Sequence, residues 1–285
     1  MREHPRLRIT TDQGIGISAV SRPGIRPAAF LFVHGLASNA RLWDGAADHL
    51  ASRGYRSVAV DQRSHGQSDK VDGPFDFATL ADDLLSVIDR SFPPETAVVA
   101  VGQSLGGNVV LELADRYPTR IAAIACIDGG FITLSRAFPD WETAARELAP
   151  PSFDKVLYTD LEKALRKHYS DWPESGILGQ LANFEVAPDG AARPHLERDH
   201  HFRLLAEMWR HRPCEIAPGI RQPVLVIAST RPMSGRAAKK ESVSRFSKLL
   251  PRSRVIWLDA HHDLHAQYPR RTAGWLEELA QEVSP

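Results

Sequence analysis

The chain has 285 residues, of which 43% are hydrophobic and 25% are charged, a composition typical of a single enzyme-sized globular protein. Lys plus Arg and Asp plus Glu each number 35, so the formal net charge is zero, which disfavours binding to nucleic acid or to an anionic membrane surface. No apolar run approaches the roughly 18 residues of a membrane helix, and residues 1–6 lack the apolar segment of a targeting peptide, so we expect a cytoplasmic protein.

Strand-like and helix-like segments alternate along most of the chain. Residues 6–11 and 15–21 alternate apolar and polar side chains around Asp12-Gln13-Gly14, which predicts an initial hairpin. The later expected elements are, in order, strand 28–33, helix 40–52, strand 55–60, helix 78–91, strand 97–101, helix 105–116, strand 121–127, strand 223–228, strand 254–258 and helix 268–282. Continuous apolar strands between helices indicate an α/β fold, with a mostly parallel sheet covered on both faces.

The alternation breaks in residues 131–214, which contain helix-like blocks but no clear buried strand. This stretch follows one predicted core strand and precedes another, so it leaves the sheet at the edge where ligands bind in α/β folds. We therefore expect a helical cap at 131–214, between the two parts of the core at 1–130 and 215–285. The alternative is a second structural layer that only adds bulk.

The segment Gly102–Asn108 carries the most specific signal of the chain, since it matches the motif G-x-S-x-G with Ser104 at its centre. An apolar strand precedes it and a helical pattern follows it, so Ser104 lies at a tight turn from strand to helix. Such a turn forces the serine into a strained conformation and needs small neighbours, which Gly102 and Gly106 supply. The hydroxyl is then held at a helix N-terminus, where backbone amides stabilise negative charge.

The two cysteines, Cys126 and Cys214, lie far apart in the sequence. Cys126 falls within an apolar strand, so a reduced buried thiol is favoured over a disulfide.

Four segments together resemble α/β-hydrolase-fold enzymes with a helical cap, over almost the whole length of the chain. They are Phe32–Gly35, Asp61–Ser68, Gly102–Asn108 and the histidine-bearing Leu258–His265. The second segment has Ser64 where the family usually has glycine, which leaves the chemistry unaffected if that loop mainly braces the nucleophile turn. The resemblance implies a serine hydrolase of the esterase or lactonase type.

A serine hydroxyl needs a base, and the base needs an acid. In resembling hydrolases the catalytic histidine follows the last strand and precedes a proline by seven residues, so Pro269 points to His262 as the base. His261 then occupies a position that usually holds glycine, and we interpret His265 as a neighbour that hydrogen-bonds locally or lines the entrance. His261 and His265 also have the spacing of metal ligands on a helix, but no third ligand is organised around them, so no metal site is expected.

The acid is expected at an unusual place. Family members most often carry it after the strand that here covers 223–228, but the following loop, residues 229–236, contains no carboxylate. A minority, including cap-bearing lactone hydrolases, place it after the preceding strand, where Asp128 follows residues 121–127. Asp128 is therefore the expected acid. If Asp128 only initiates a turn, the site is a Ser–His dyad or uses Asp263, which is too close in sequence to the base to aim at its ring.

An oxyanion requires fixed donors, and backbone amides suit this role because they need no reorganisation. The nucleophile turn supplies the amide of Leu105, and the resemblance implies the amide of Leu36 as the second donor. Asn39, Arg41 and Trp43 are expected to line the pocket nearby.

The expected reaction is acyl transfer to water with Ser104 as nucleophile, Asp128 as acid and His262 as base, in the chain order of the family. The expected substrate is a small-molecule carboxylic ester or lactone with an apolar part under the cap, and no cofactor is expected. Carbon–carbon cleavage, thioester hydrolysis and perhydrolysis use the same groups. Epoxide and haloalkane hydrolysis are disfavoured because they use an aspartate nucleophile. A small-molecule-binding protein with weak turnover is the alternative from another class.

Overall fold

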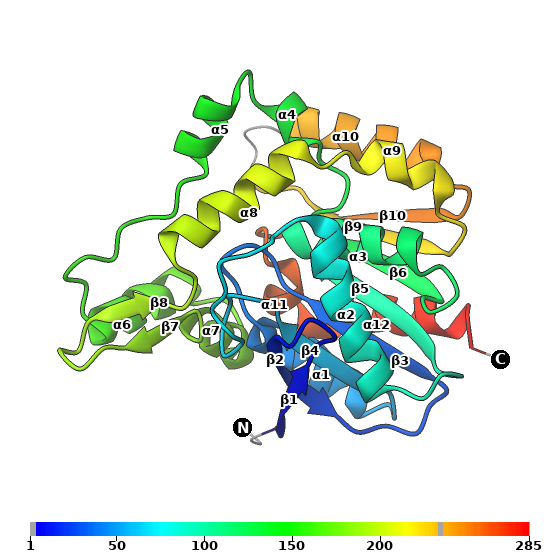
Figure 1. Ribbon diagram of the computed structural model, residues 1–285, viewed down its shortest axis with the longest axis horizontal. Coiled ribbons are helices and arrows are strands. Elements are labelled where there is room, and N and C mark those ends of the chain that lie inside the picture. Colours follow the sequence, from blue (N-terminus) through cyan, green and yellow to red (C-terminus); the bar gives the residue numbers. More distant parts are fainter. Residues whose placement is uncertain (1–3, 233–235, 285) are drawn as a thin grey trace.

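The computed structural model describes residues 4–232 and 236–284. Ten strands are present in this part of the chain: β1 (Arg6–Thr10), β2 (Gly16–Arg22), β3 (Ala28–Val33), β4 (Arg56–Asp61), β5 (Ala97–Gln103), β6 (Ala123–Ile127), β7 (Phe184–Val186), β8 (Ala192–Pro194), β9 (Val224–Ser229) and β10 (Ser253–Leu258). Eight of them form the central sheet of Figure 1, in the order β1-β2-β4-β3-β5-β6-β9-β10. No helix of the described residues is long and apolar enough to cross a membrane.

The sheet is parallel from β4 to β10, and the β1–β2 hairpin joins it antiparallel through β2 and β4. All six residues of β3 are buried, as expected for a strand covered on both faces. Because parallel strands point the same way, the carboxyl ends of β3, β5, β6, β9 and β10 meet at one edge of the sheet. The residues that follow these strands are therefore brought together there.

Helices cover both faces of this sheet. The helices of the core are α1 (Asp44–Ala51), α2 (Phe77–Ser91), α3 (Leu105–Arg116), α10 (Arg236–Leu249), α11 (Leu264–Gln267) and α12 (Pro269–Gln281), with the short 3-10 helix η1 (Ala40–Trp43) before α1. The side chains of β3 alternate between two hydrophobic clusters, with Leu31 in the cluster shared with α2 and α3. Phe30 belongs to the other cluster, shared with α1 and α12. The predicted α/β fold is confirmed.

The chain between β6 and β9 forms helices α4 (Leu134–Ala137), α5 (Trp141–Glu147), α6 (Tyr158–His168), α7 (Glu174–Leu181), α8 (Arg198–Arg210) and α9 (Pro213–Ile216), the 3-10 helix η2 (Ala217–Gly219) and the β7–β8 hairpin. Figure 1 shows α6, α7 and the hairpin as a lobe beside the core, with α8 running from this lobe back over the sheet edge. The lobe is fixed to η1 by apolar contacts between α7 and Leu42. The hairpin was not predicted, because Ala192 is its only buried residue.

Other differences from the sequence-based expectation are local. The helix expected at 40–52 is divided into η1 and α1. Helix α10 gave no clear amphipathic pattern, since only Val243 and Phe246 are buried in it. Both cysteines are free thiols, and burial raises the pKa of Cys126 to about 12, so this thiol is unreactive.

Candidate active site

Ser104 occupies the turn between β5 and α3. Its backbone has φ 53° and ψ −120°, a left-handed conformation that is strained for a residue with a side chain. A Cβ atom on Gly102 would overlap the backbone of Gly106, and a Cβ on Gly106 would overlap the carbonyl of Val33. The expected strained turn with obligatory small neighbours is therefore present, and it leaves the Ser104 side chain partly exposed.

Asp128 follows β6, the strand that pairs with β5, and lies next to the serine turn. Its own φ is 46°, and a Cβ atom on the next residue, Gly129, would overlap the backbone of Ser104. The absence of a side chain at Gly129 thus allows the two turns to touch. The Asp128 residue is only 2% exposed.

His262 lies in the loop between β10 and α11 and faces Asp128. Its Nδ1 atom is 2.7 Å from Oδ2 of Asp128, and its side chain is 52% exposed. The carbonyl of His262 also accepts a long 3.5 Å hydrogen bond from the amide side chain of Gln103, the residue before Ser104. Asp263 points elsewhere, because its Oδ2 accepts a 2.8 Å hydrogen bond from Nε2 of Gln180 on α7.

Charge at this site favours an ionised acid beside a basic imidazole. Burial raises the pKa of Asp128, but the hydrogen bond and charge of His262 and the ammonium group of Lys239 outweigh it, so the pKa is lowered. Partial desolvation by the surrounding protein lowers the pKa of His262, while the Asp128 hydrogen bond and the carboxylates of Asp263 and Asp128 raise it above its ordinary value. The pair can therefore hold a proton on Nδ1 and accept a second at Nε2.

The amides of Leu36 and Leu105 donate to no acceptor within residues 4–232 and 236–284. Leu36 lies in the loop after β3. The next residue, Ala37, has φ 57°, and its amide donates to Nε2 of His65 at 3.3 Å. The other ring nitrogen, Nδ1, lies 3.0 Å from the carbonyl of Arg63, which fixes the neutral tautomer that carries its proton on Nδ1.

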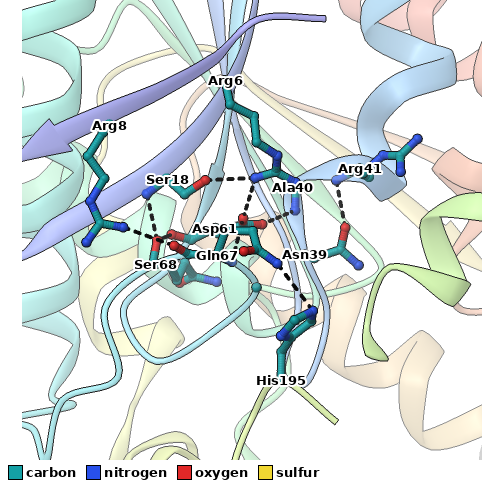
Figure 2. Close-up of polar contacts among 12 residues, drawn as sticks. Arg6, Arg8, Ser18, Asn39, Ala40, Arg41, Asp61, Gln67, Ser68 and His195 are labelled. Atoms are coloured by element: carbon teal, nitrogen blue, oxygen red, sulfur yellow. Dashed lines mark hydrogen bonds and ion pairs between the residues drawn. The ribbon is translucent and has the colours of Figure 1, made fainter. Parts of the chain in front are cut away.

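A second anchor for the same loop is Asp61, shown in Figure 2. This buried carboxylate accepts hydrogen bonds from the amide of Ala40 at 2.8 Å, the amide of Gln67 at 3.0 Å and Nη1 of Arg6 at 3.0 Å. Together with His65, it shows that the segment 61–68 braces the loop after β3. The expectation that this segment mainly braces the serine turn is therefore corrected.

Ser64, where the family usually has glycine, has φ 64°, which explains the usual preference. Its hydroxyl donates to the carbonyl of Val71 at 3.0 Å and accepts from the amide of Val71, so local hydrogen bonds support the strained backbone.

Three side chains expected near the pocket lie elsewhere. Trp43 is fully buried in the core, stacked on Phe32 with ring centroids 4.8 Å apart. Asn39 and Arg41 line a separate polar cavity of about 260 Å³, which Asp61 also lines. Figure 2 shows Arg41 directed away from Asp61. The sequence placed these residues near the loop but could not give the direction of their side chains.

His265 also differs from its expected role. It is 1% exposed, it packs against Trp43 with ring centroids 4.0 Å apart, and neither ring nitrogen has a hydrogen-bond partner among the described residues. Helix α11 begins at Leu264 and turns the ring into the core, so it neither hydrogen-bonds locally nor lines an entrance. The described residues contain no group of three or more His, Cys, Asp or Glu side chains placed to hold a metal ion.

Two cavities bear on the site, one that includes His262 and one that begins at Ala37. One, of about 640 Å³, is lined by Arg231, Pro232, Asp259, His261 and His262. The other, of about 930 Å³, reaches from Ala37 into the segment between β6 and β9, and its lining is mixed, with ten apolar and nine polar or charged residues. Its apolar lining residues are Ala37, Pro150, Pro151, Phe153, Phe184, Ala187, Ala191, Ala192, Pro194 and Leu196.

Residues 28–267 match the family model described as alpha/beta hydrolase fold, so the chain belongs to this family. A 2-(acetamidomethylene)succinate hydrolase of Mesorhizobium japonicum is 27% identical over 79% of this chain and 78% of its own length. A bifunctional esterase/perhydrolase of Acinetobacter calcoaceticus is 30% identical over 60% of each chain. The chain is thus similar to these two hydrolases over 60–79% of its length.

Two further comparisons bear on how far this likeness extends. An uncharacterized protein of Mycobacterium tuberculosis is 35% identical over 108 residues, but the match spans only 30% of its length. The crystal structure of an E-2-(acetamidomethylene)succinate hydrolase superposes with a TM-score of 0.78 over 98% of this chain and 100% of that chain, at 20% identity. At this identity the structural likeness shows the shared fold alone.

Proposed function

We propose that the protein is a serine hydrolase that cleaves a carboxylic ester or lactone through an acyl-enzyme on Ser104. The observation that carries this proposal is the 2.7 Å hydrogen bond between Asp128 and His262, formed beside a serine held in a strained turn. A nucleophile, a base and an ionised acid at one sheet edge are the parts that acyl transfer requires. The esterase/perhydrolase relative supports ester chemistry.

In the proposed mechanism, Nε2 of His262 takes the proton from the Ser104 hydroxyl as its oxygen attacks the substrate carbonyl. Asp128 holds Nδ1 protonated and stabilises the imidazolium that forms. The amides of Leu36 and Leu105 donate to the oxyanion. This role is supported by the absence of any other acceptor for these amides among the described residues. His262 then protonates the leaving oxygen, which completes the acyl-enzyme. In the second half, the same imidazole deprotonates a water molecule, which attacks the acyl-enzyme, releases the carboxylic acid product and restores Ser104.

The segment 131–214 acts as the cap in this proposal. This segment supplies every lining residue except Ala37 to the cavity of about 930 Å³, and nine of those it supplies are apolar. Ala37 is next in the chain to the proposed oxyanion donor Leu36. A cavity of this size and lining fits an apolar alkyl or aryl group of the substrate. The substrate class is therefore an ester or lactone with a sizeable apolar part.

The test combines active-site labelling with turnover. We expect one fluorophosphonate adduct on Ser104 by intact mass, together with hydrolysis of p-nitrophenyl esters, and neither in Ser104→Ala. An adduct without ester turnover would move the reaction to thioester or carbon–carbon bond cleavage on the same residues. Absence of both adduct and turnover in a folded protein would reject the proposal in favour of a ligand-binding protein.

A further inference from the structure

Lys239, on α10, reaches the carboxylate of Asp128. Its Nζ atom lies 3.0 Å from Oδ1 and 3.0 Å from Oδ2 of Asp128. The lysine side chain is only 18% exposed, and Nζ also donates to Oγ and to the carbonyl oxygen of Ser229, at 2.9 and 3.3 Å. The ammonium group is thus largely shielded from water and hydrogen-bonded to both oxygens of the proposed catalytic acid.

Both oxygens of Asp128 are occupied by fixed donors. Oδ1 accepts from the amide of Ser229 at 2.8 Å and from Lys239, while Oδ2 accepts from Oγ of Ser229 at 2.7 Å, from His262 and from Lys239. A carboxylate bound on both oxygens cannot rotate away from the imidazole. A simple acid–base pair needs no buried cation at this place, so Lys239 adds something that Ser229 does not, namely positive charge.

We propose that Lys239 is a positioning residue of the active site, which holds the Asp128 carboxylate toward His262 and offsets part of its negative charge. This inference rests on the proposed function. Its consequence is that the imidazole is less strongly drawn to its protonated form than it would be beside an unpaired buried carboxylate. More of the base is then free to accept the serine proton in mildly acidic solution.

Two other charged side chains near the pair have partners of their own. Asp263, next to His262 in the chain, favours imidazole protonation, but its carboxylate is bound by Gln180. Arg231 lines the same cavity as His262, yet its guanidinium pairs with Asp259 at 2.8 and 2.9 Å, which largely cancels its charge. Lys239, by contrast, is in direct hydrogen-bond contact with Asp128.

The sign of the effect on the base follows from charge. A positive charge near an imidazole disfavours the protonated form, so Lys239 lowers the pKa of His262. Removing it by Lys239→Met therefore raises this pKa. The acidic limb of the rate then moves to higher pH, because only the neutral imidazole accepts a proton.

The experiment compares Lys239→Met and Lys239→Arg with wild type. Two quantities are measured against pH: the His262 ring resonances by NMR, and the rate of Ser104 labelling by a fluorophosphonate. We expect both midpoints to move upward in Lys239→Met and to stay near the wild-type value in Lys239→Arg. Lys240→Met removes an exposed cation one residue away and is the matched control, with no expected shift.

Unchanged midpoints in Lys239→Met would overturn the inference, and an equal shift in Lys240→Met would reduce it to general electrostatics. If Lys239→Met fails to fold, Lys239→Gln keeps a hydrogen-bond donor without the charge and must show the same upward shift. The NMR titration separates this inference from the proposed function. A shifted His262 midpoint without any Ser104 adduct would support the contact between Lys239 and the pair while rejecting the hydrolase.

Discussion

Ser229 binds both carboxylate oxygens of Asp128, with its amide 2.8 Å from Oδ1 and its hydroxyl 2.7 Å from Oδ2. Ser229 ends β9, the strand after which resembling hydrolases most often carry the acid. The loop that follows β9 has no carboxylate at the usual acid position. Its first residue, Ser229, instead supports the carboxylate of Asp128, which follows the neighbouring strand β6.

We expect Ser229→Ala to lower kcat/KM about tenfold and to cost about 1 kcal/mol of stability, since one buried hydrogen bond to a charged group is lost while the Ser229 amide remains. Ester turnover and urea unfolding measure the two effects. Ser244→Ala, an exposed serine on α10, is the control. Full activity in Ser229→Ala would mean that the backbone amide and Lys239 suffice to hold Asp128.

Substitution of the two candidate acids is expected to lower activity by very different amounts. Asp128→Asn presents an amide to Nδ1 of His262 and favours the wrong tautomer, so kcat falls by roughly 10⁴-fold. Asp263→Asn keeps an acceptor for Gln180 and costs less than about tenfold, because only a peripheral charge is lost. Steady-state kinetics on one p-nitrophenyl ester rank the two. A larger loss in Asp263→Asn would move the acid to that residue.

The strained backbone of Ser104 predicts that glycine is more stable than alanine at this position. Ser104→Gly and Ser104→Ala both lack the nucleophile and are expected to be inactive. Glycine adopts a φ of 53° without steric cost, so Ser104→Gly should be more stable than Ser104→Ala by about 1 kcal/mol. Thermal and urea unfolding of the two inactive variants measure this difference. Equal stabilities would show that the turn holds little strain.

Buried His265 predicts a loss of stability in acid. Burial lowers its pKa from 6.5 to about 4. Between these two pH values the unfolded chain binds a proton at this residue and the folded chain does not. Stability contributed by the neutral ring is present above pH 6.5 and is lost as pH falls toward 4. At pH 5 the loss is about 2 kcal/mol.

His265→Leu removes both the titration and two ring nitrogens without partners in the described chain. Its unfolding free energy should therefore exceed that of wild type by more at pH 5 than at pH 8. Urea unfolding at the two pH values tests this, and a constant difference would contradict the assignment of the acid sensitivity to His265.

The apolar part of the cavity that begins at Ala37 predicts a preference for substrates with long acyl chains. Phe153 and Phe184 line it and contact each other edge to face, with ring centroids 4.6 Å apart. Phe153→Ala should lower kcat/KM for p-nitrophenyl octanoate about tenfold and leave the acetate unchanged, because only the longer chain reaches the lost surface. Leu157→Ala, at a 47% exposed residue that is not part of this lining, is the control. Equal losses on both esters would place the acyl chain elsewhere.

The sequence predicted the core strands because each is a short apolar run between turns. It predicted the strained turn at Ser104 because the motif has steric requirements that few other turns share. The proximity of Asp128 and His262 was also foreseeable, since parallel strands end at one edge. These inferences depend on local pattern and on the topology of the fold.

Contacts that depend on packing between elements could not be predicted. Lys239 stands in a polar stretch with a weak helical pattern, and its contact with Asp128 exists only because α10 packs beside β9. His265 lies three residues from His262, but the turn into α11 sends its ring into the core. In both cases side-chain direction, rather than residue type, decides the role.

The positions of Asp128 and His262 in the chain also set the order in which reactivity arises during synthesis. Ser104 and Asp128 come from adjacent strands and leave the ribosome close together, whereas His262 follows Asp128 by 134 positions. Domains fold as units from the N-terminal side during translation. In the proposed mechanism, the serine of a nascent or truncated chain therefore lacks its base, and nucleophilic reactivity begins only after β10 has joined the sheet.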